Sequence, residues 1–350
     1  MLRRLRKALA NLFYYVSILW GVVTLCFFLF FVFPDSEEIM MGQRSDPQTR
    51  EAIRKQMGLD QSVAVRYAQY INRLSPISFY QQTQDINGLT IPLGFTYLVF
   101  KSPDLGSSFK NKKQVSSILK EALTGTLVLA GTAMFIALIL GISLGIISAS
   151  VYQSALDKSI LIGSTLFISV PSFFSAILIA WFFGYIAHAT TGLNMTGSLY
   201  MPDPQTGNQV LMLQNLILPC LALSLRPVAV ITQLMRSSML QELKEDYIRT
   251  ARAKGLHPRI ISLKHALINA VNPVITAASG WFASMMAGAF FVEFIFNWKG
   301  LGKVLIDSVQ LGDLPVASAG IVYIALIFIC VQALVNMSYI WVDPKLRYPS

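Results

Sequence analysis

The chain consists of long apolar runs without charged residues, separated by shorter stretches that carry most of its charge. A helix needs about 20 consecutive apolar residues to cross a bilayer, and only helices and closed barrels satisfy their backbone hydrogen bonds in lipid. Barrel strands alternate apolar and polar positions, whereas these runs are continuously apolar. The pattern therefore predicts an all-α polytopic membrane protein with six spans. The predicted spans cover about residues 11–33, 122–148, 159–187, 216–235, 273–296 and 319–342.

The first run follows a basic start within residues 1–10. A secretory signal peptide is the alternative interpretation, but the run is longer than a typical signal core. Residues 33–35 (Phe-Pro-Asp) also offer no small-residue cleavage site. We therefore expect an uncleaved first span within residues 1–33 that begins in the cytoplasm. Six spans then place the C-terminal tail, residues 343–350, in the cytoplasm as well.

The stretch between the first two spans, residues 34–118, is too polar to cross a membrane and is expected outside. Within it, residues 76–101 alternate in polarity and contain β-branched side chains, which predicts a small hairpin or an extended loop. Two roles stay open for this part: contact with a partner protein, or a neutral elaboration of the kind that loops tolerate. The other five spans form a core over residues 119–342. In its first span, Gly141 and Gly145 make a small-xxx-small face for close helix packing.

Composition and charge agree with a membrane protein. The sequence is 54% hydrophobic and 13% charged, and its net charge is +10. Such a charge can indicate nucleic-acid binding, but the basic residues are spread along the loops that flank the spans. The positive-inside rule explains this distribution without a nucleic-acid partner. The densest basic loop, about residues 236–269, is therefore expected in the cytoplasm.

Candidate catalytic and metal-binding chemistry is absent from the sequence pattern. Each of the three cysteines lies within an apolar run, so a disulfide framework is not expected. The three histidines are scattered, and no cluster with metal-ligand spacing can be assembled from them. A Gly-Lys-Ser/Thr phosphate loop and a G-x-S-x-G elbow are both missing. The sequence therefore predicts no catalytic residue, no metal site and no cofactor bound by this chain.

The stretch EDYIRTARAKG, Glu245 to Gly255, is the most distinctive charged segment. Leu240, Leu243, Tyr247 and Ala251 fall at helical spacing, which predicts a short helix with an apolar stripe over about residues 240–256. Its acidic residues come first and its basic residues last, which suits the helix dipole.

Two local features of this segment lead to further expectations. Glu245 and Arg249 are spaced for an ion pair, and Gly255 provides a helix stop. The small residues Ala251, Ala253 and Gly255 would let another surface come close. Docking of a soluble partner and a merely solvated loop are the two interpretations that the residues allow.

EDYIRTARAKG followed by KHALINAVNPV resembles the cytoplasmic coupling loop of ATP-binding-cassette importer permeases, in the dipeptide, oligopeptide and nickel branch. DLGSSF at Asp104–Phe109, FNWKGLG at Phe296–Gly302 and the terminal VDPKLRYPS resemble other motifs of that family. Residues 76–101 have no counterpart in the usual family pattern.

The resemblance implies a permease subunit in a bacterial cytoplasmic (inner) membrane that forms half of a translocation pathway. Its expected partners are a second related permease, membrane lipid, an external solute-binding protein and two ATPase subunits that hold ATP and Mg. The substrate stays open between peptides, nickel and other small solutes. A stand-alone channel, carrier or membrane scaffold is the alternative. The residues expected to contact the ATPase are Glu245, Asp246, Tyr247, Arg249, Thr250, Ala251, Arg252, Ala253, Lys254 and Gly255.

Arg226, Glu293 and Pro171 are the candidates for the translocation pathway. An arginine inside a span costs from about 2.5 kcal/mol upward, which makes it a functional hypothesis by default. Arg226 has three possible roles: to hold a substrate carboxylate, to pair with Glu293, or to bond carbonyls freed by a proline kink. The pair requires a fourth span that begins near Pro219, a start that suits proline's preference for the first helical turn. Pro171 is expected to kink the third span.

Overall fold

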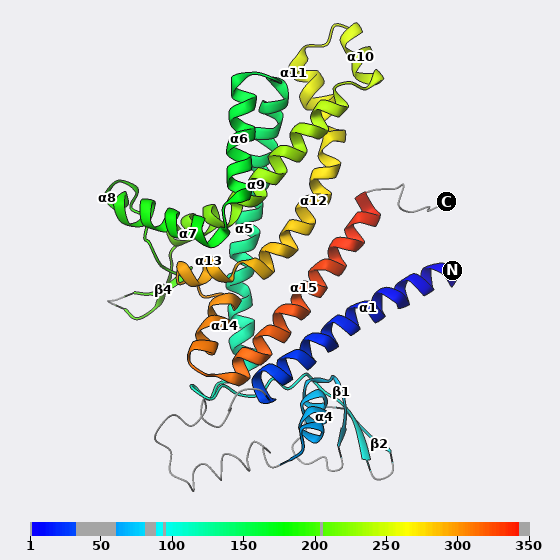
Figure 1. Ribbon diagram of the computed structural model, residues 1–350, viewed down its shortest axis with the longest axis vertical. Helices are drawn as coiled ribbons and strands as arrows, with labels where there is room; N and C mark the ends of the chain where they lie inside the picture. The colour runs from blue at the N-terminus through cyan, green and yellow to red at the C-terminus, as the bar shows by residue number, and fades with distance from the viewer. Residues whose placement is uncertain (1, 33–60, 81–88, 94–95, 204–205, 343–350) are drawn as a thin grey trace. The chain divides into compact units, whose positions relative to one another are not determined.

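The computed structural model describes residues 2–32, 61–80, 89–93, 96–203 and 206–342 (Figure 1). The predicted tail at 343–350 and residues 34–60 of the predicted external segment lie outside this part of the chain. The fold divides into two compact units. The first comprises Met1–Glu121 with Val304–Ile327, and the second comprises Ala122–Lys303 with Phe328–Ser350.

In the first unit, a membrane-length helix supports a small helix and a sheet. The long helix is α1 (Leu2–Phe27), continued by the π-helical turn η1 (Phe28–Val32), and the small helix is α4 (Val63–Leu74). The ring of Phe27 packs 5.2 Å from that of Tyr67 and 5.5 Å from that of Tyr70. Val322, from the part of α15 (Leu314–Val342) in this unit, completes a small core.

The sheet lies within residues 76–101, where the sequence predicts a hairpin or extended loop. Its strands are β1 (Ile77–Tyr80), β2 (Leu89–Leu93) and β3 (Thr96–Phe100), antiparallel in the order β1-β3-β2. The β2–β3 pair confirms the predicted hairpin, and β1 adds a third strand. Pro92 lies in edge strand β2, where a missing N–H is tolerated.

The second unit is built around α9 (Gln214–Glu242), which packs against α6, α7 and α12. Gly141 and Gly145 of α5 (Val115–Ser150) confirm the predicted close packing. A Cβ at Gly141 would lie 2.6 Å from the Ile231 side chain, and one at Gly145 would lie 2.5 Å from that of Met235. The remaining helices here are α6 (Ala155–Ser169), α7 (Ser172–Ile179), η2 (Ala180–Ile186), α8 (His188–Thr191), α10 (Asp246–Ala253), α11 (Pro258–Ile260), η3 (Ile261–Ala266), α12 (Leu267–Gly288), α13 (Phe290–Ile295) and the start of α14 (Leu301–Gln310).

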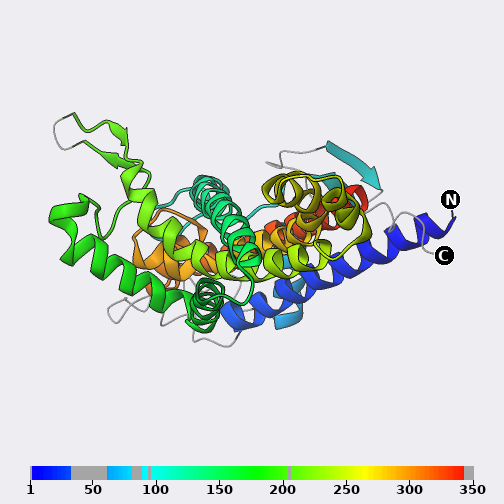
Figure 2. The same ribbon diagram turned by 90° about the horizontal axis from the view of Figure 1, so that it is seen from above.

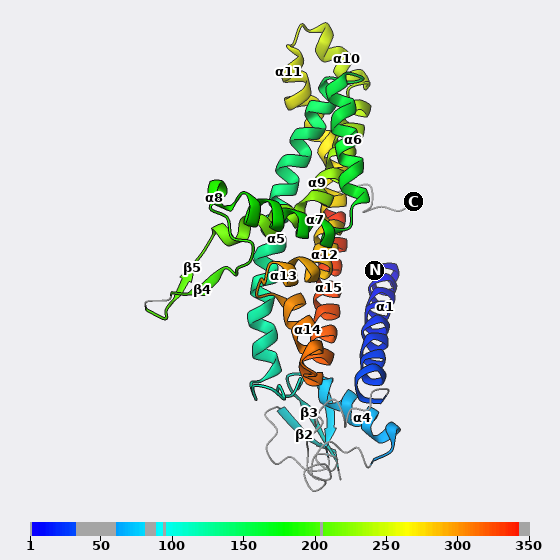
Figure 3. The same ribbon diagram turned by 60° about the vertical axis from the view of Figure 1, so that its left-hand side comes forward.

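In the part of the chain that the structure describes, five helical segments are long and apolar enough to cross a membrane. They cover residues 10–32, 115–150, 214–242, 258–286 and 314–335. The third predicted span is instead two helical segments, Ala155–Ser169 and Ser172–Ile186, bent by 106° at the break (Figure 3). The break falls at Pro171, where the sequence predicts a kink, but the bend is too sharp for one continuous helix. Six spans result only if this bent pair counts as one.

Two other predicted spans need correction. Helix α9 begins at Gln214, so Pro219 is its sixth residue and not part of its first turn. Asn215 stabilises this earlier start, because its side chain donates to the Ser198 carbonyl at 3.0 Å. The fifth predicted span is divided at Ala289 between α12 and α13. The connection ahead of α9, expected to be loops, contains α8 and a hairpin of β4 (Tyr200–Pro202) and β5 (Gln209–Leu211) that projects beyond the start of α9 (Figure 2).

Candidate functional site

The short helix α10 (Asp246–Ala253) is the centre of the predicted coupling segment. Glu245 is its N-cap residue, with extended backbone angles, and a turn at Leu243–Glu245 separates α10 from the end of α9. That turn breaks the predicted stripe, because Leu240 and Leu243 belong to the preceding helix and its C-cap. Ile248 and Ala251 are the buried residues of α10, and this helix packs against η3.

The other predicted coupling residues are exposed. Ala251, expected to admit a partner surface, is 7% exposed and packs within the chain itself. Arg249 lies 3.1 Å from Asp246 rather than pairing with Glu245, and both of these side chains are largely in solvent. An exposed pair of this kind contributes little to stability. The exposed members of the set are Glu245, Asp246, Tyr247, Arg249, Thr250, Arg252, Ala253, Lys254 and Gly255.

Gly255 confirms the predicted helix stop. Its φ is +75°, in the left-handed region that non-glycine residues resist. The Leu256 N–H bonds the Ala251 carbonyl at 3.3 Å, and the Gly255 N–H bonds the Arg252 carbonyl at 2.9 Å. These two bonds form a Schellman motif, which satisfies the free carbonyls at the end of α10. The glycine is needed for its backbone, since an added Cβ would meet nothing within 4 Å.

Tyr247 ties α10 to two membrane-length helices. Its hydroxyl donates to the Glu242 carboxylate on α9 and accepts a 3.0 Å bond from Nδ2 of Asn269 on α12. Burial and the Glu242 hydrogen bond raise the pKa of the Tyr247 hydroxyl, so it remains a donor at neutral pH. Sequence reasoning assigned Tyr247 to an apolar stripe and missed this bridge, because Glu242 and Asn269 both lie outside the Glu245–Gly255 stretch.

Arg226 bonds the backbone just ahead of Pro171, at the break after α6. The guanidinium of Arg226 donates from Nε and Nη2 to the Ile168 carbonyl, at 3.2 and 3.1 Å. That carbonyl lies in the last turn of α6, where helical partners are lacking. Pro171 follows as the N-cap residue of α7. The third role considered for Arg226, bonding a carbonyl freed near a proline, is thus the one that the structure contains.

Glu293 lies in a closed polar cluster. Its side chain is fully buried and accepts bonds from Oγ1 of Thr126 at 2.6 Å and from the Gly302 N–H at 2.7 Å. A Cβ at Gly300 would lie 2.3 Å from the Glu293 carboxyl group, so the FNWKGLG segment wraps closely around it. Among the residues that the structure describes, no ion pair joins Arg226 to Glu293. The pairing that the sequence left open is therefore not formed.

A second buried carboxylate, Asp157, was missed by the sequence analysis. Arg236 donates to both of its oxygens, from Nε at 2.7 Å and from Nη2 at 2.8 Å. Ser148 Oγ and the Gln153 N–H also donate to it, at 2.5 and 2.9 Å. In the sequence, Asp157 and Arg236 both lie next to loops that are expected on the same side of the membrane. That shared side was the sequence signal that the two residues could meet. The cluster links the ends of α5, α6 and α9.

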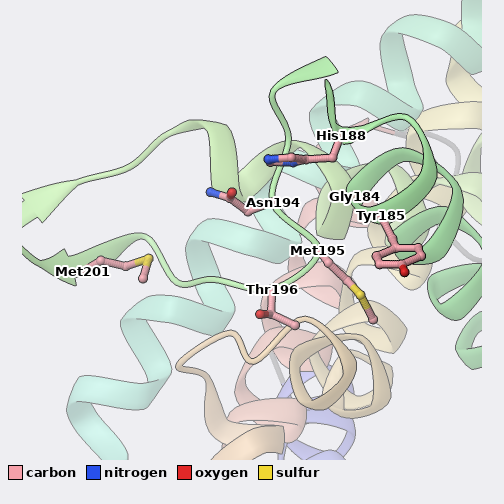
Figure 4. Close-up of a pocket in the computed structure, with 7 residues that line it drawn as sticks. All are labelled: Gly184, Tyr185, His188, Asn194, Met195, Thr196 and Met201. Carbon is pink, nitrogen blue, oxygen red and sulfur yellow. The ribbon is translucent and has the colours of Figure 1, made fainter. Parts of the chain in front are cut away.

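An open depression of about 540 Å³ lies beside η2 and α8 (Figure 4). Two of its polar side chains, those of His188 and Asn194, are engaged within the chain. Nδ1 of His188 lies 2.6 Å from the Leu193 carbonyl oxygen, and Asn194 donates to the Asn215 side chain at 3.0 Å. None of the predicted site residues lines this depression. In the part of the chain that the structure describes, no group of three His, Cys, Asp or Glu side chains could hold a metal ion.

Comparisons with known sequences cover almost the whole chain. The sequence model of the family described as "binding-protein-dependent transport system inner membrane component" matches residues 141–348, and that of the corresponding N-terminal region matches residues 1–130. The chain is 28% identical to a dipeptide transport system permease protein, DppB, of Alkalihalophilus pseudofirmus, covering 98% of this chain and 100% of the relative. A di/tripeptide transport system permease protein, DppB, of Pseudomonas aeruginosa is 31% identical, with 94% and 95% covered. A probable D,D-dipeptide transport system permease protein, DdpB, of Escherichia coli is also 31% identical, with 95% and 94% covered.

The fold also resembles a solved structure, an inward-facing form of the MetNI methionine ABC transporter. The TM-score is 0.53 at 15% identity, and the match covers 65% of this chain and 97% of that one. This likeness supports the fold, and the matched family models supply the identity. The chain therefore belongs to the family of binding-protein-dependent transport system inner membrane components, which makes it a membrane-spanning permease subunit of an ATP-binding-cassette importer, with ATP hydrolysed by separate subunits.

Proposed function

We propose that this permease carries short peptides and is driven by ATPase subunits that dock on α10. The peptide substrate is supported by the relatives, whose names specify dipeptides, di- and tripeptides and D,D-dipeptides. A second related permease subunit supplies the other half of the pathway, and an external binding protein delivers the peptide. ATP and Mg are held by two ATPase subunits in the cytoplasm, on the same side as α10 and both termini of this chain.

The observation that carries the docking proposal is the way α10 is attached. Its inner contacts are Ile248 and Ala251, and its outer surface is polar and exposed. A solvated loop needs neither the Schellman stop at Gly255 nor the double hydrogen bond of Tyr247. These features hold a charged surface in a fixed orientation, which is what a docking partner requires.

The same attachments provide a route for mechanical coupling. A force on α10 reaches α9 through Glu242 and α12 through Asn269, because Tyr247 bonds both side chains. From α9, the paired Arg236 and Asp157 extend the connection to α6. ATP-driven closure of the ATPase subunits would thereby move three packed helices together. Arg226 lies on α9, so it would move with them.

An exposed position on α10 gives a sharp test of docking. Ala253→Arg adds a bulky charge to the outer surface, and Ala253→Ser is the matched conservative control. We expect Ala253→Arg to lose co-purification with the ATPase subunits and to lose uptake, while the control keeps both. Ala251→Arg is unsuitable, because Ala251 is buried within the chain. Normal assembly and normal uptake with Ala253→Arg would refute docking at α10.

The substrate is tested separately. Membrane vesicles that contain the whole transporter and its binding protein would be supplied with a radiolabelled dipeptide, the free amino acids or Ni²⁺. We expect ATP-dependent accumulation of the dipeptide alone. Accumulation of Ni²⁺ without the dipeptide would overturn the peptide assignment and leave the docking proposal intact.

A further inference from the structure

One face of the three-stranded sheet carries a cluster of six apolar side chains. Directly paired residues on antiparallel strands point to the same face. The register pairs Ile77 and Leu89 with Phe100, and it pairs Phe79 and Ile91 with Leu98. We call this set the apolar sheet face: Ile77, Phe79, Leu89, Ile91, Leu98 and Phe100.

Five of the six residues of the apolar sheet face are exposed, and Leu98 is partly buried. Leu89 is 69% exposed and Phe79 is 60% exposed, whereas Ser78 and Val99 on the opposite face are 0% exposed. Antiparallel sheets of soluble proteins usually show the reverse, with the apolar face packed on the core and the polar face in water. The side chains of this sheet are thus arranged for an apolar environment outside the chain.

The sheet is fixed in this orientation by α4. The side-chain amide of Asn72 donates to the Phe79 carbonyl at 3.0 Å and accepts from the Phe79 N–H at 2.9 Å. Oγ of Ser78 donates to the Asn72 carbonyl at 2.7 Å. These bonds occupy the free edge of β1 and its inner face. The sheet therefore cannot rotate its apolar face inward without breaking them.

Helix α4 is in turn fixed to the end of the first membrane-length helix. The Tyr67 hydroxyl lies 2.7 Å from Oγ1 of Thr24, and Nη2 of Arg66 donates to the Phe31 carbonyl at 2.6 Å. Thr24 precedes the end of the candidate span at Val32 by eight residues, or about 12 Å of helix. The partner of Tyr67 therefore lies within the span itself. Arg66 bonds Phe31, one residue before the end of the span, so α4 lies beside the last turns of the span, near the level at which tyrosine is enriched.

We propose that the apolar sheet face inserts into the lipid headgroup and acyl boundary of the leaflet in which α1 ends. Amphipathic elements bound in this way bury their apolar face only about 5–10 Å deep. Three strands of four or five residues span about 14 by 14 Å, or roughly 200 Å². A stable protein partner covers about 800 Å² on each side, several times this area. Lipid therefore fits the face better than a docked protein does.

The test uses the full chain in lipid nanodiscs, with its three cysteines replaced. Single cysteines at Phe79→Cys and Leu89→Cys would carry an environment-sensitive fluorophore. Thr90→Cys is the matched control, because Thr90 is exposed on the same strand as Leu89 but on the opposite face. We expect brominated lipid to quench positions 79 and 89 at least about threefold more than position 90, as an interfacial depth requires. Aqueous iodide should give the reverse order.

Two results would overturn the proposal. Equal quenching of all three positions by iodide would show that the face is in water. Protection of positions 79 and 89 from both quenchers would show that protein covers the face. The use of two labelled strands keeps the test valid if one variant fails to fold. Because the measurement needs no substrate or ATPase, its outcome is independent of the proposed transport function.

Discussion

At the scale of single residues, substitution of Gly255 tests whether this glycine acts in coupling or only in stability. Placing a residue with a Cβ in the left-handed region costs about 1–2 kcal/mol. Gly192, at the end of α8, is a matched control: its φ is +65° and an added Cβ would also meet nothing within 4 Å. We expect Gly255→Ala and Gly192→Ala to lose similar thermal stability in detergent. Only Gly255→Ala should lower peptide uptake for each ATP hydrolysed, and equal uptake by the two variants would make Gly255 a helix stop alone.

Tyr247 gives a second test at this scale. Tyr247→Phe keeps the ring and removes both hydrogen bonds of the hydroxyl. Helix α10 then loses the side-chain hydrogen bonds to Glu242 on α9 and to Asn269 on α12. We expect the ATPase subunits still to assemble, with ATP hydrolysis retained and uptake reduced several-fold. Tyr200→Phe, on the exposed strand β4, serves as the control. Unchanged uptake in Tyr247→Phe would exclude the hydroxyl from coupling.

The direction of the Tyr247 pKa also fixes a pH dependence. Its pKa is raised in the folded protein, so its hydrogen bond contributes fully below the ordinary tyrosine pKa of about 10. That contribution is lost only as the pH rises through the folded-state value. Stability differences between wild type and Tyr247→Phe should therefore be constant through neutral pH and diminish in strong alkali. A difference that already disappears near pH 8 would contradict the assignment of the hydroxyl as donor.

At the scale of helices and strands, the sequence predicts what depends on local composition. Long apolar runs identify the membrane-length helices, and Gly141 with Gly145 correctly marks a close helix contact. Alternation predicts the hairpin of β2 and β3. The sequence does not show how far the helix bends at Pro171. The bend is 106°, and the Arg226 side chain that bonds the Ile168 carbonyl at the break comes from 58 positions away in the chain.

The contacts missed by the sequence analysis join positions far apart in the chain. Asp157 and Arg236 are separated by 79 positions, and Tyr247 meets Asn269 22 positions away. Side chains with such separations meet only after the helices pack. The motif around Tyr247 predicts a coupling segment, but it could not indicate that the hydroxyl would bridge two helices.

The Asp157–Arg236 pair should behave as a unit that joins α6 to α9. Asp157 is 1% exposed, and removing one partner of a buried pair leaves an uncompensated charge at a cost of about 3–5 kcal/mol. We expect Arg236→Met to lower the free energy of unfolding by about 3 kcal/mol. This is the lower end of that range, because Arg236 is partly exposed. The double variant Asp157→Asn with Arg236→Met should recover part of this loss. Thermal unfolding in one detergent would compare the wild type, Asp157→Asn, Arg236→Met and the double variant. A loss of stability in the double variant equal to the sum of the two single losses would contradict a coupled pair.

At the scale of the whole molecule, the bent pair of helices decides the membrane topology. Helix α6 has 15 residues and is about 22 Å long, which is shorter than a hydrocarbon core of about 30 Å. It crosses only if α7 and η2 complete the passage after the bend. If the pair instead returns to the side it started from, the segments before and after it lie on the same side. The location of α10 then changes, because α9 is the one remaining span between the pair and α10.

Cysteine accessibility in intact cells distinguishes these topologies. In a cysteine-free background, Thr90→Cys, Gln209→Cys and Ala253→Cys would be treated with a membrane-impermeant maleimide. If the bent pair crosses, α5 leads inward, the pair leads outward and α9 leads inward again. Positions 90 and 209 should then react from outside, and position 253 only after the cells are opened. If the pair is re-entrant, position 209 is protected and position 253 reacts from outside. That result would place α10 away from the cytoplasm and would remove the basis for its contact with the ATPase subunits.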